Sequence, residues 1–374
     1  MSSRIVGPTP LGGAELRSVA GPDNQTDCAI ATTADDTARP MQPPTQALMQ
    51  LIAGATVAQA ISVVCKLGIA DLLRAGPRTC VDMAAAVGAH APSLYRVLRA
   101  LAGVGIFAED QDGGFVLTPL AQPLRSDVPN SVQAYAVMSG ERWVWRSLGE
   151  IEHSVRTGES AFEHVFGAPL FDYYSAHPEA GQVSANALSS LSRRDNDAVI
   201  DAYDFTGART IIDIGGGQGS LLAAVLVANP GLRGVLFERQ PVIEMARTQL
   251  NAAGVADRCE LVSGDFFATI PAGGDIYIMK KVIHDWNDDD ARVILKRAHA
   301  AMPASARLLL ADHVVPPGNE PSEAKWLDLL MLVYAGGRER TESEHRDLLA
   351  SAEFAFDRIV PTASSVSLIE ARPR

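Results

Sequence analysis

Residues 210–220 read TIIDIGGGQGS, and this stretch decides the fold. The apolar run at 210–214 predicts a buried strand, and the glycines that follow it predict a tight turn. Residues 221–227 then have the pattern of a helix, and residues 234–237 that of a second strand. Strand, glycine turn, helix and strand in this order are typical of the start of a doubly wound, Rossmann-like α/β domain.

The glycine turn predicts a ligand site. Gly215, Gly217 and Gly219 let the backbone approach a bound molecule closely, and Asp213 places a carboxylate at the end of the strand. A G-x-G turn alone does not separate dinucleotide-binding enzymes from methyltransferases. The dinucleotide pattern would place its third glycine at Ser220, whereas it stands here at 219, so the sequence does not predict a pyrophosphate at this helix.

Acidic residues follow the next two predicted strands. Glu238 lies 23 residues after Gly215 and is positioned to accept hydrogen bonds from the two hydroxyls of a ribose. Asp265 and Phe266 follow the third strand, at 260–262, where the carboxylate could accept a hydrogen bond from an adenine amino group and the ring could cover the base. The alternative is that both acids are ordinary turn residues at strand ends.

The fourth predicted strand, 276–279, leads into the segment KKVIHDW at 280–286. His284 therefore lies at the carboxyl end of a strand, where ligands bind in open α/β sheets, and a histidine there can act as a general base. Asn287 to Asp290 predict a polar cap for the helix that follows. A surface histidine without a catalytic role is the alternative for His284, and His299, His313 and His345 lack its combination of features.

The N-terminal half predicts a different organisation. Residues 1–44 have no aromatic residue and six prolines, so we expect a disordered tail. Residues 46–67 form a helical pattern whose apolar surface is wide enough to predict burial against a second copy of the chain, hence a homodimer. We place a helical dimerisation and substrate-lid domain at 45–200 and a cofactor-binding catalytic domain at 201–374.

Within the first domain, residues 81–117 predict a winged helix-turn-helix: a helix at 81–87, a second helix from Ser93, and a hairpin from 106–107 and 115–117. Such a module can bind DNA. The expected hairpin turn, however, is acidic, and the whole chain has 32 basic and 44 acidic residues, a net charge of 32 − 44 = −12. We therefore expect a role in dimerisation, with no nucleic-acid partner.

Composition sets further limits. The longest uninterrupted apolar runs, such as 221–227, are far shorter than the roughly 20 residues that span a bilayer, so we expect a cytoplasmic protein with no membrane partner. Four scattered cysteines form no disulfide framework, and no group of residues has the sequence spacing of a metal site. We expect no metal.

Four motifs in order, D-x-G-G-G-x-G at 213–219, G-D-F-F at 264–267, H-D-W at 284–286 and G-G-R-E-R-T at 336–341, carry a resemblance. Over residues 46–372 the chain resembles the S-adenosylmethionine-dependent O-methyltransferases of the plant caffeic acid and bacterial polyketide-tailoring type, which include the hydroxyindole O-methyltransferases. The resemblance implies S-adenosylmethionine as cofactor and a small aromatic hydroxyl compound as substrate. It also implies a seven-stranded sheet, completed here by an antiparallel hairpin from 354–359 and 366–369.

The resemblance also implies roles for individual residues. His284 corresponds to the general base, and Glu339 to one of two carboxylates that hold its imidazole. The other carboxylate falls 28 residues after the histidine, at Asp312, where the family has a longer glutamate. Either Asp312 still reaches the imidazole, which we favour, or Glu339 orients the base alone. The cofactor-binding positions are Gly215, Glu238, Asp265, Phe266 and Lys280, and Trp286 corresponds to a residue near the adenine, although it could also belong to the core.

Two other functions stay open at this point. An enzyme of the same fold can retain the cofactor and catalyse a reaction other than methyl transfer, and the departure at Asp312 leaves room for that. The winged helix could instead belong to a ligand-sensing DNA-binding regulator, against the charge argument above. Aromatic residues concentrated between 130 and 200 indicate a flat, apolar ligand, although ordinary helix packing would also explain them.

Overall fold

The computed structural model describes residues 43–374, and the chain divides into two compact units between Gln122 and Pro123. The predicted disorder of residues 1–44 falls almost entirely outside the described residues. The division of roles predicted at residue 200, with a dimerisation and substrate-lid domain before it and a catalytic domain after it, stays a prediction. In the structure the helices between residues 133 and 202 belong to the same unit as the seven-stranded sheet, because residues such as Val199 pack into the core of that sheet.

The first unit contains the predicted winged helix. Two helices are followed by a hairpin, and a short strand completes a three-stranded antiparallel sheet in the order β1-β3-β2. The Thr79 hydroxyl accepts a hydrogen bond from the Asp82 backbone N–H, which caps the first of these helices. The elements are α1 (Pro44–Lys66), α2 (Ile69–Leu72), η1 (Leu73–Ala75), β1 (Arg78–Thr79), α3 (Cys80–Val87), α4 (Ala91–Gly103), β2 (Phe107–Glu109) and β3 (Gly114–Leu117), with η2 (Pro119–Leu124) leading to the second unit.

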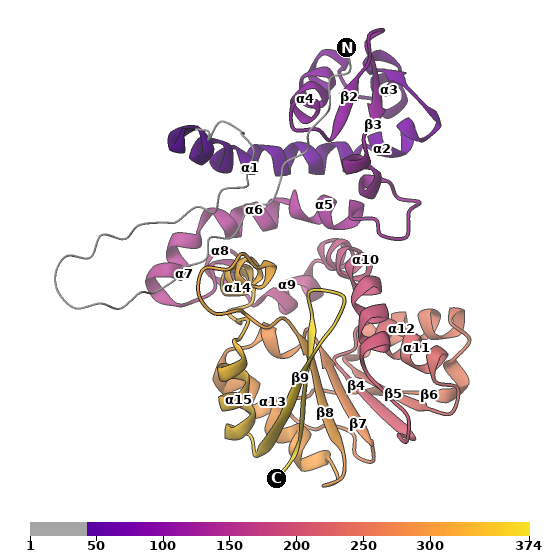
Figure 1. Ribbon diagram of the computed structural model, residues 1–374, viewed down its shortest axis with the longest axis vertical. Helices are drawn as coiled ribbons and strands as arrows, with labels where there is room; N and C mark the ends of the chain where they lie inside the picture. The colour runs from indigo at the N-terminus through magenta and orange to yellow at the C-terminus, as the bar shows by residue number, and fades with distance from the viewer. Residues whose placement is uncertain (1–42) are drawn as a thin grey trace, which may run out of the picture. The chain divides into compact units, whose positions relative to one another are not determined.

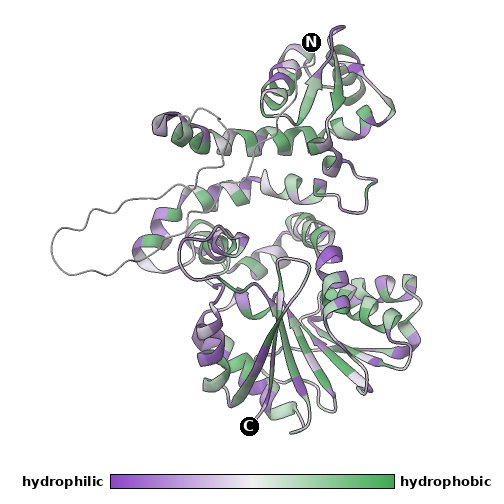
Figure 2. Ribbon diagram, in the orientation of Figure 1, coloured by the Kyte–Doolittle hydropathy of each residue, from purple (hydrophilic) through white to green (hydrophobic). Residues whose placement is uncertain are grey.

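Helix α1 contains many hydrophobic residues (Figure 2), and several of their side chains are exposed. Leu48, Met49, Leu51 and Ile52 are all more than half exposed, which indicates a surface that another molecule covers. Among the described residues, α1 is also the one helix whose length and apolar composition would allow it to cross a membrane. Its sequence contains no long uninterrupted apolar run, because polar residues such as Gln50 lie between the apolar ones.

The second unit begins with helices rich in aromatic residues and continues as an α/β domain (Figure 1). The helices are α5 (Gln133–Ser139), α6 (Arg142–Gly149), α7 (Ile151–Thr157), α8 (Ala161–Phe166), α9 (Leu170–Ala176) and α10 (Pro178–Ala202). The α/β part consists of β4 (Thr210–Ile214), α11 (Ser220–Ala228), β5 (Arg233–Glu238), α12 (Gln240–Ala252), η3 (Ala256–Arg258), β6 (Cys259–Ser263), β7 (Ile276–Lys280), η4 (Ile283–Asp285), α13 (Asp288–Ala301), β8 (Arg307–Asp312), α14 (Glu323–Tyr334), α15 (Glu342–Ser351), β9 (Phe354–Pro361) and β10 (Ser367–Pro373).

The seven strands form one sheet in the order β6-β5-β4-β7-β8-β10-β9, which confirms the predicted fold class. Strands β4 to β8 are parallel, and β10 pairs antiparallel with both β8 and β9, as the predicted C-terminal hairpin requires. The order reverses at β4, so β4 and β7 are neighbours although β5 and β6 lie between them in the chain. Ligands bind at this switch point in doubly wound sheets.

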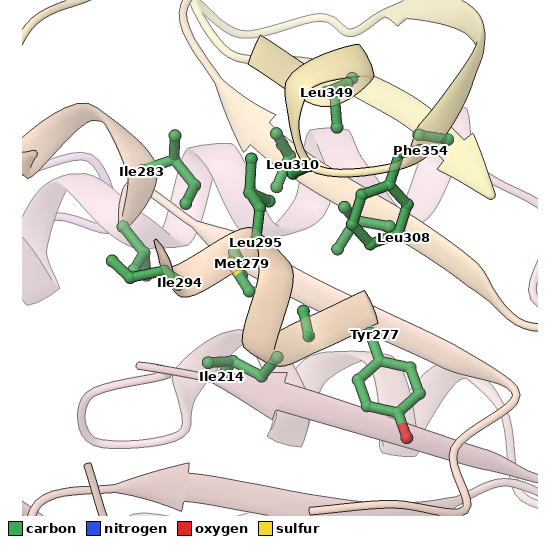
Figure 3. Packing of buried hydrophobic residues seen from close by; sticks show 14 of the residues in the cluster. Ile214, Tyr277, Met279, Ile283, Ile294, Leu295, Leu308, Leu310, Leu349 and Phe354 are labelled. Carbon is green, nitrogen blue, oxygen red and sulfur yellow. The ribbon is translucent and has the colours of Figure 1, made fainter. Parts of the chain in front are cut away.

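Alternate residues of each central strand pack on opposite faces of the sheet. Tyr277 and Met279 of β7 belong to a core that α13 and α15 cover, which Figure 3 shows from close by. Ile276 and Ile278 belong to a second core, under α10, α11 and α12. Because apolar residues fill both faces, the strand is a continuous apolar run in the sequence. Burial of such side chains stabilises the fold by about 1.5–3 kcal/mol each.

Candidate active site

The glycine turn after β4 is packed on one side and open on the other. Gly215, Gly217 and Gly219 have φ angles of 66°, 58° and 75°, which favour glycine. A Cβ on Gly216 would lie 2.3 Å from an oxygen of Asp213, whereas a Cβ on Gly217 would meet no atom within 4 Å. The turn therefore leaves its backbone at Gly217 accessible to a ligand.

Asp213 lies beneath this turn and is completely buried. Burial raises the pKa of its carboxyl to about 7, although the Lys280 ammonium acts in the opposite direction. Its carboxylate contacts the turn from the inside, so it supports the backbone at Gly216. A direct contact between Asp213 and a cofactor stays a prediction.

Glu238 joins the end of β5 to the same turn. Its Oε2 accepts a hydrogen bond of 3.1 Å from the Gly217 N–H, and its Oε1 accepts one of 2.8 Å from the Arg239 N–H. These bonds fix the carboxylate beside the open part of the turn, where further lone pairs can accept hydroxyl donors. The structure thus brings together two residues that the sequence predicted for one ligand.

Aromatic rings form a wall on the other side of the turn. The ring of Phe266 lies 3.7 Å from the position that a Cβ on Gly215 would take. The Trp286 ring is 5.9 Å from that of Phe266 and 4.7 Å from that of Phe267, centroid to centroid. Asp265 is exposed at the start of this loop, where its Oδ1 accepts a hydrogen bond from the Phe267 N–H.

Two residues that the sequence analysis did not assign extend this wall. The Phe171 ring of α9 stacks on the Trp286 ring, with centroids 6.4 Å apart and an interplanar angle of 27°. The Arg239 guanidinium lies 5.9 Å from the centre of the Phe171 ring. Arg239 directly follows Glu238, so a cation and an aromatic ring lie beside the carboxylate proposed for the ribose. No local sequence signal connects Phe171 to residues that follow it by more than sixty positions.

Lys280, the residue at the end of β7, donates a hydrogen bond to Oδ1 of Asn196 in α10. Burial lowers the pKa of its ammonium to about 8, and Lys281 acts in the same direction. Lys281 itself forms an ion pair of 2.7 Å with Asp195. Both lysines therefore attach α10 to the edge of the sheet, and a cofactor contact of Lys280 stays a prediction.

His284 lies in η4, immediately after β7, and is buried. Its Nδ1 lies 2.6 Å from Oε1 of Glu339, a short charge-assisted hydrogen bond, and its Nε2 lies 3.6 Å from Oδ1 of Asp285. Burial alone would lower the pKa of the imidazole. The carboxylates of Asp285 and Glu339 outweigh burial and raise the pKa of His284 to about 9.

The two predicted carboxylate partners of His284 behave differently. Burial alone would raise the pKa of Glu339, but its interactions with His284 and His313 lower it to about 2, so it is a carboxylate at neutral pH. Both Asp312 carboxyl oxygens are buried and make no hydrogen bond among the described residues. We expected the Asp312 carboxylate to reach the His284 imidazole, but it forms no hydrogen bond with it. The aspartate side chain is one methylene shorter than that of glutamate. Asp312 acts on His284 through its charge alone.

His313 joins this group, contrary to the sequence analysis. One ligand atom each from His284, His313 and Glu339 lie within 4.8 Å of one another, so the fold creates a cluster that sequence spacing did not reveal. Two ligands of a tetrahedral zinc ion bound at 2.0–2.1 Å are about 3.3 Å apart. The 2.6 Å between His284 and Glu339 is shorter, which identifies a hydrogen-bonded pair. The expectation that no metal takes part stays a prediction.

The loop at 336–341 is fixed to the loop that carries His284. The Arg338 N–H donates a hydrogen bond of 2.8 Å to the carbonyl of His284. The buried Arg340 guanidinium donates to the carbonyls of Ile283 and Trp286 and pairs with Asp288 at 2.8 Å. Asn287 caps α13 on the other side, as predicted, by accepting from two backbone N–H groups. The motif at 336–341 thus holds the loop of His284 in place and also supplies Glu339.

Comparison with known proteins agrees with this geometry. A model of the O-methyltransferase domain matches residues 145–355, and a model of the O-methyltransferase dimerisation domain matches residues 49–127. The chain is 46% identical to a phenazine O-methyltransferase (PhzM) of Lysobacter antibioticus over 87% of this chain and 95% of that protein. It is 43% identical to the mitomycin biosynthesis 6-O-methyltransferase of Streptomyces lavendulae, over 86% and 93% of the two chains.

Solved structures show the same relationship. A crystal structure of LaPhzM superposes with a TM-score of 0.85 at 46% identity, covering 89% of this chain and all of that one. CalO1, a methyltransferase in calicheamicin biosynthesis solved in its SAH-bound form, gives a TM-score of 0.78 at 35% identity, over 88% of this chain and 98% of that one. The chain therefore belongs to the O-methyltransferase family, with S-adenosylmethionine as its cofactor and a dimerisation domain of that family at its N-terminal end.

Proposed function

We propose that this protein methylates a hydroxyl group of a small aromatic molecule and that His284 is the general base. The observation that carries the proposal is the buried pair of His284 and Glu339, with His284 in the loop after β7, the strand that pairs with β4. The glycine turn offers open backbone at Gly217, with the Glu238 carboxylate on one side and an aromatic wall on the other. This combination fits an adenosyl group.

The chemistry of a phenol explains why a base is required. A phenol has an unperturbed pKa of about 10 and is a weak nucleophile while it keeps its proton. Bound S-adenosylmethionine supplies an electrophilic methyl group on its sulfonium. Transfer of that methyl group to the substrate oxygen would break its bond to sulfur and leave S-adenosylhomocysteine. Nε2 of a neutral His284 would take the hydroxyl proton, while Glu339 holds the Nδ1–H and stabilises the resulting imidazolium. Holding the two reactants in line contributes several kcal/mol to lowering the barrier.

The aromatic helices support a flat substrate. The Trp143 ring of α6 lies 5.4 Å from that of Tyr174, 6.3 Å from that of Phe162 and 6.5 Å from that of Tyr334. Burial raises the pKa of the Tyr174 hydroxyl, and the Asp285 carboxylate adds to the rise. One of the relatives named above is a phenazine O-methyltransferase, and phenazine is a flat, polycyclic aromatic molecule, which agrees with a polycyclic aromatic substrate.

A nitrogen acceptor is the second candidate, because one relative, 31% identical, is a phenazine-1-carboxylate N-methyltransferase of Pseudomonas aeruginosa. An aromatic nitrogen has a free lone pair and needs no proton removed before it attacks. The buried base with its ionised Glu339 partner favours oxygen, because it would serve no purpose for a ring nitrogen.

The direct test incubates the protein with S-adenosylmethionine and a panel of polycyclic phenols, each paired with its nitrogen analogue. We expect methyl ethers by mass spectrometry, with one S-adenosylhomocysteine released for each methyl group transferred. Methylation confined to nitrogen would contradict the proposed acceptor. Cofactor turnover without any methylated product would favour another reaction on the same fold.

The pH dependence of kcat/KM tests the assignment of the base. Only neutral His284 can accept a proton, so its raised pKa of about 9 predicts that kcat/KM rises with pH up to about 9. Asp285→Asn removes a carboxylate that raises this pKa and is expected to shift the rising limb to lower pH. The control is Asp289→Asn, which removes an exposed carboxylate of α13 and leaves the limb in place. An unshifted or upward-shifted limb in Asp285→Asn would argue against this role of His284.

The proposed assembly is a cytoplasmic homodimer that uses α1, without nucleic-acid or membrane partners. The dimerisation-domain match includes most of α1, and the acidic turn between β2 and β3 is unsuited to phosphates. Leu51→Glu places a charge in the apolar surface and is expected to give single chains by light scattering, because a buried unpaired charge is strongly unfavourable. Val155→Glu in α7 is the matched control, since both side chains are 71% exposed. A Leu51→Glu protein that stays dimeric would exclude α1 from the interface.

A further inference from the structure

His313 lies beside Glu339 because the two chain segments pair through their backbones. The segment after β8 forms a parallel bridge between Val314 and Arg340, and the Val315 N–H donates a hydrogen bond of 3.0 Å to the Arg340 carbonyl. His313 and Glu339 each precede a residue of this bridge. Their proximity therefore follows from the main chain as well as from side-chain rotamers.

The His313 side chain contacts the oxygen that also binds the base. Its Nδ1 lies 3.4 Å from Oε1 of Glu339, the atom that is 2.6 Å from Nδ1 of His284. At 3.4 Å the contact is longer than a standard hydrogen bond and is electrostatic in character. Its Nε2 lies 3.1 Å from the Ser365 hydroxyl. One carboxylate oxygen thus lies between two buried imidazoles.

The Glu339 carboxylate determines which nitrogen of a neutral His313 carries the proton, because a bare Nδ1 would turn its lone pair towards that anion. If the Ser365 hydroxyl donates to Nε2, the neutral ring must carry its hydrogen on Nδ1, facing Glu339. If the ring is protonated, both nitrogens carry hydrogens. In either state an N–H of His313 points at the Glu339 carboxylate.

Glu339 depends on this contact for its orientation. Its Oε2 has no hydrogen-bond partner among the described residues, so both side-chain contacts are made at Oε1. Its backbone N–H is bound to Asp328 at 2.9 Å, which fixes the main chain but not the carboxylate plane. Without His313, only the base itself would hold the carboxylate that is meant to orient the base.

We propose that His313 is a positioning residue that holds the Glu339 carboxylate against His284. The inference rests on the proposed function, in which His284 removes the substrate proton. His313 does not touch the reacting atoms in this arrangement. Its contribution is expected in the rate of the chemical step and not in the binding of substrate or cofactor.

The test compares two substitutions at the same position in the full-length protein. His313→Leu removes the N–H and is expected to lower kcat by about 10- to 100-fold, as misplacement of a catalytic group does. KM and the dissociation constant for S-adenosylmethionine, measured by calorimetry, should stay within about twofold of wild type. His313→Asn offers an amide N–H close to the position of Nδ1 and is expected to recover most of the lost kcat.

Two further variants serve as control and as safeguard. His299→Leu replaces a half-buried histidine that packs on Phe354 instead of Glu339, and it should leave kcat unchanged. Ser365→Ala removes only the hydroxyl that anchors His313 and is expected to lower kcat by a few-fold. If His313→Leu does not fold, Ser365→Ala and His313→Asn decide the question.

A folded His313→Leu protein with wild-type kcat would overturn the proposal. It would also be overturned if His313→Asn were as slow as His313→Leu, or if the loss appeared in KM alone. Failure of the proposed function is recognised separately, because the wild-type protein would then give no methylated hydroxyl in the same assay.

Discussion

His284→Ala is expected to lower kcat by about 10²- to 10⁴-fold while the affinity for S-adenosylmethionine stays within about twofold. The imidazole is the proposed acceptor of the substrate proton, and the substitution leaves Glu339 and the cofactor turn in place. The proposed cofactor-binding residues are the turn at 215–219 and Glu238, none of which contacts His284 through a hydrogen bond. The two quantities should therefore separate.

The measurement combines steady-state kinetics on one methylated phenol with calorimetric titration of the cofactor. His299→Ala is the control, because it removes another histidine of the same unit that is remote from Glu339 in its contacts. Loss of both turnover and cofactor binding would indicate collapse of the site and not removal of a base. A kcat within tenfold of wild type would show that another group, or water, accepts the proton.

Gly337→Ala is also expected to lower kcat strongly, because a methyl group at this position would clash with the loop that carries His284. A Cβ at this position would lie 2.1 Å from the carbonyl oxygen of His284 and 2.4 Å from the carbonyl carbon of Asp285. Both are backbone atoms, so rotating a side chain cannot relieve the clash. The two loops must separate, which weakens the Arg338 hydrogen bond to His284 and moves Glu339 away from the imidazole.

We expect Gly337→Ala to lower kcat by about 100-fold, because a displacement of 1 Å in a catalytic group has an effect of that size. The free energy of unfolding should fall by about 1–3 kcal/mol, as overpacking of a well-packed site does. Gly231→Ala is the matched control, since a Cβ there meets no atom within 4 Å. Urea unfolding and kcat are measured on both proteins. Wild-type values of both quantities for Gly337→Ala would refute the proposed coupling of the two loops.

Residues at strand ends were predictable from the sequence. Asp213, Glu238, Asp265 and His284 each lie at or just after the end of a strand that an apolar run had marked. Parallel strands bring their carboxyl ends to one edge of the sheet, so local patterns together with one rule of topology were enough to group these residues. The cap of α13 at Asn287 and the C-terminal hairpin were predictable for the same local reason.

Contacts between segments distant in the chain were not predictable in this way. His313 lacked every local sign of function and yet contacts the Glu339 oxygen that is hydrogen-bonded to His284. Lys280 corresponded to a cofactor-binding position, but its ammonium is held by Asn196, 84 residues earlier. Arg340 belonged to a recognised motif but had no assigned role. Its guanidinium donates hydrogen bonds to the carbonyls of Ile283 and Trp286, on either side of His284. Each of these contacts depends on the packing of chain segments that are distant in the sequence, which the periodicity of apolar residues does not predict.

By itself the sequence determined the class of fold, the edge of the sheet at which the site lies, and the residue that is the proposed base. These depend on strand periodicity, glycine conformation and the order of elements, all of which are local. Only the tertiary structure decided how that base is held: Glu339 forms a 2.6 Å hydrogen bond, Asp312 acts through charge alone, and His313 shares the Glu339 oxygen. The physical reason is that a hydrogen bond forms only over a narrow range of donor–acceptor distances. A difference of one methylene or about one ångström leaves only a charge interaction, and the packing of the loops fixes that distance.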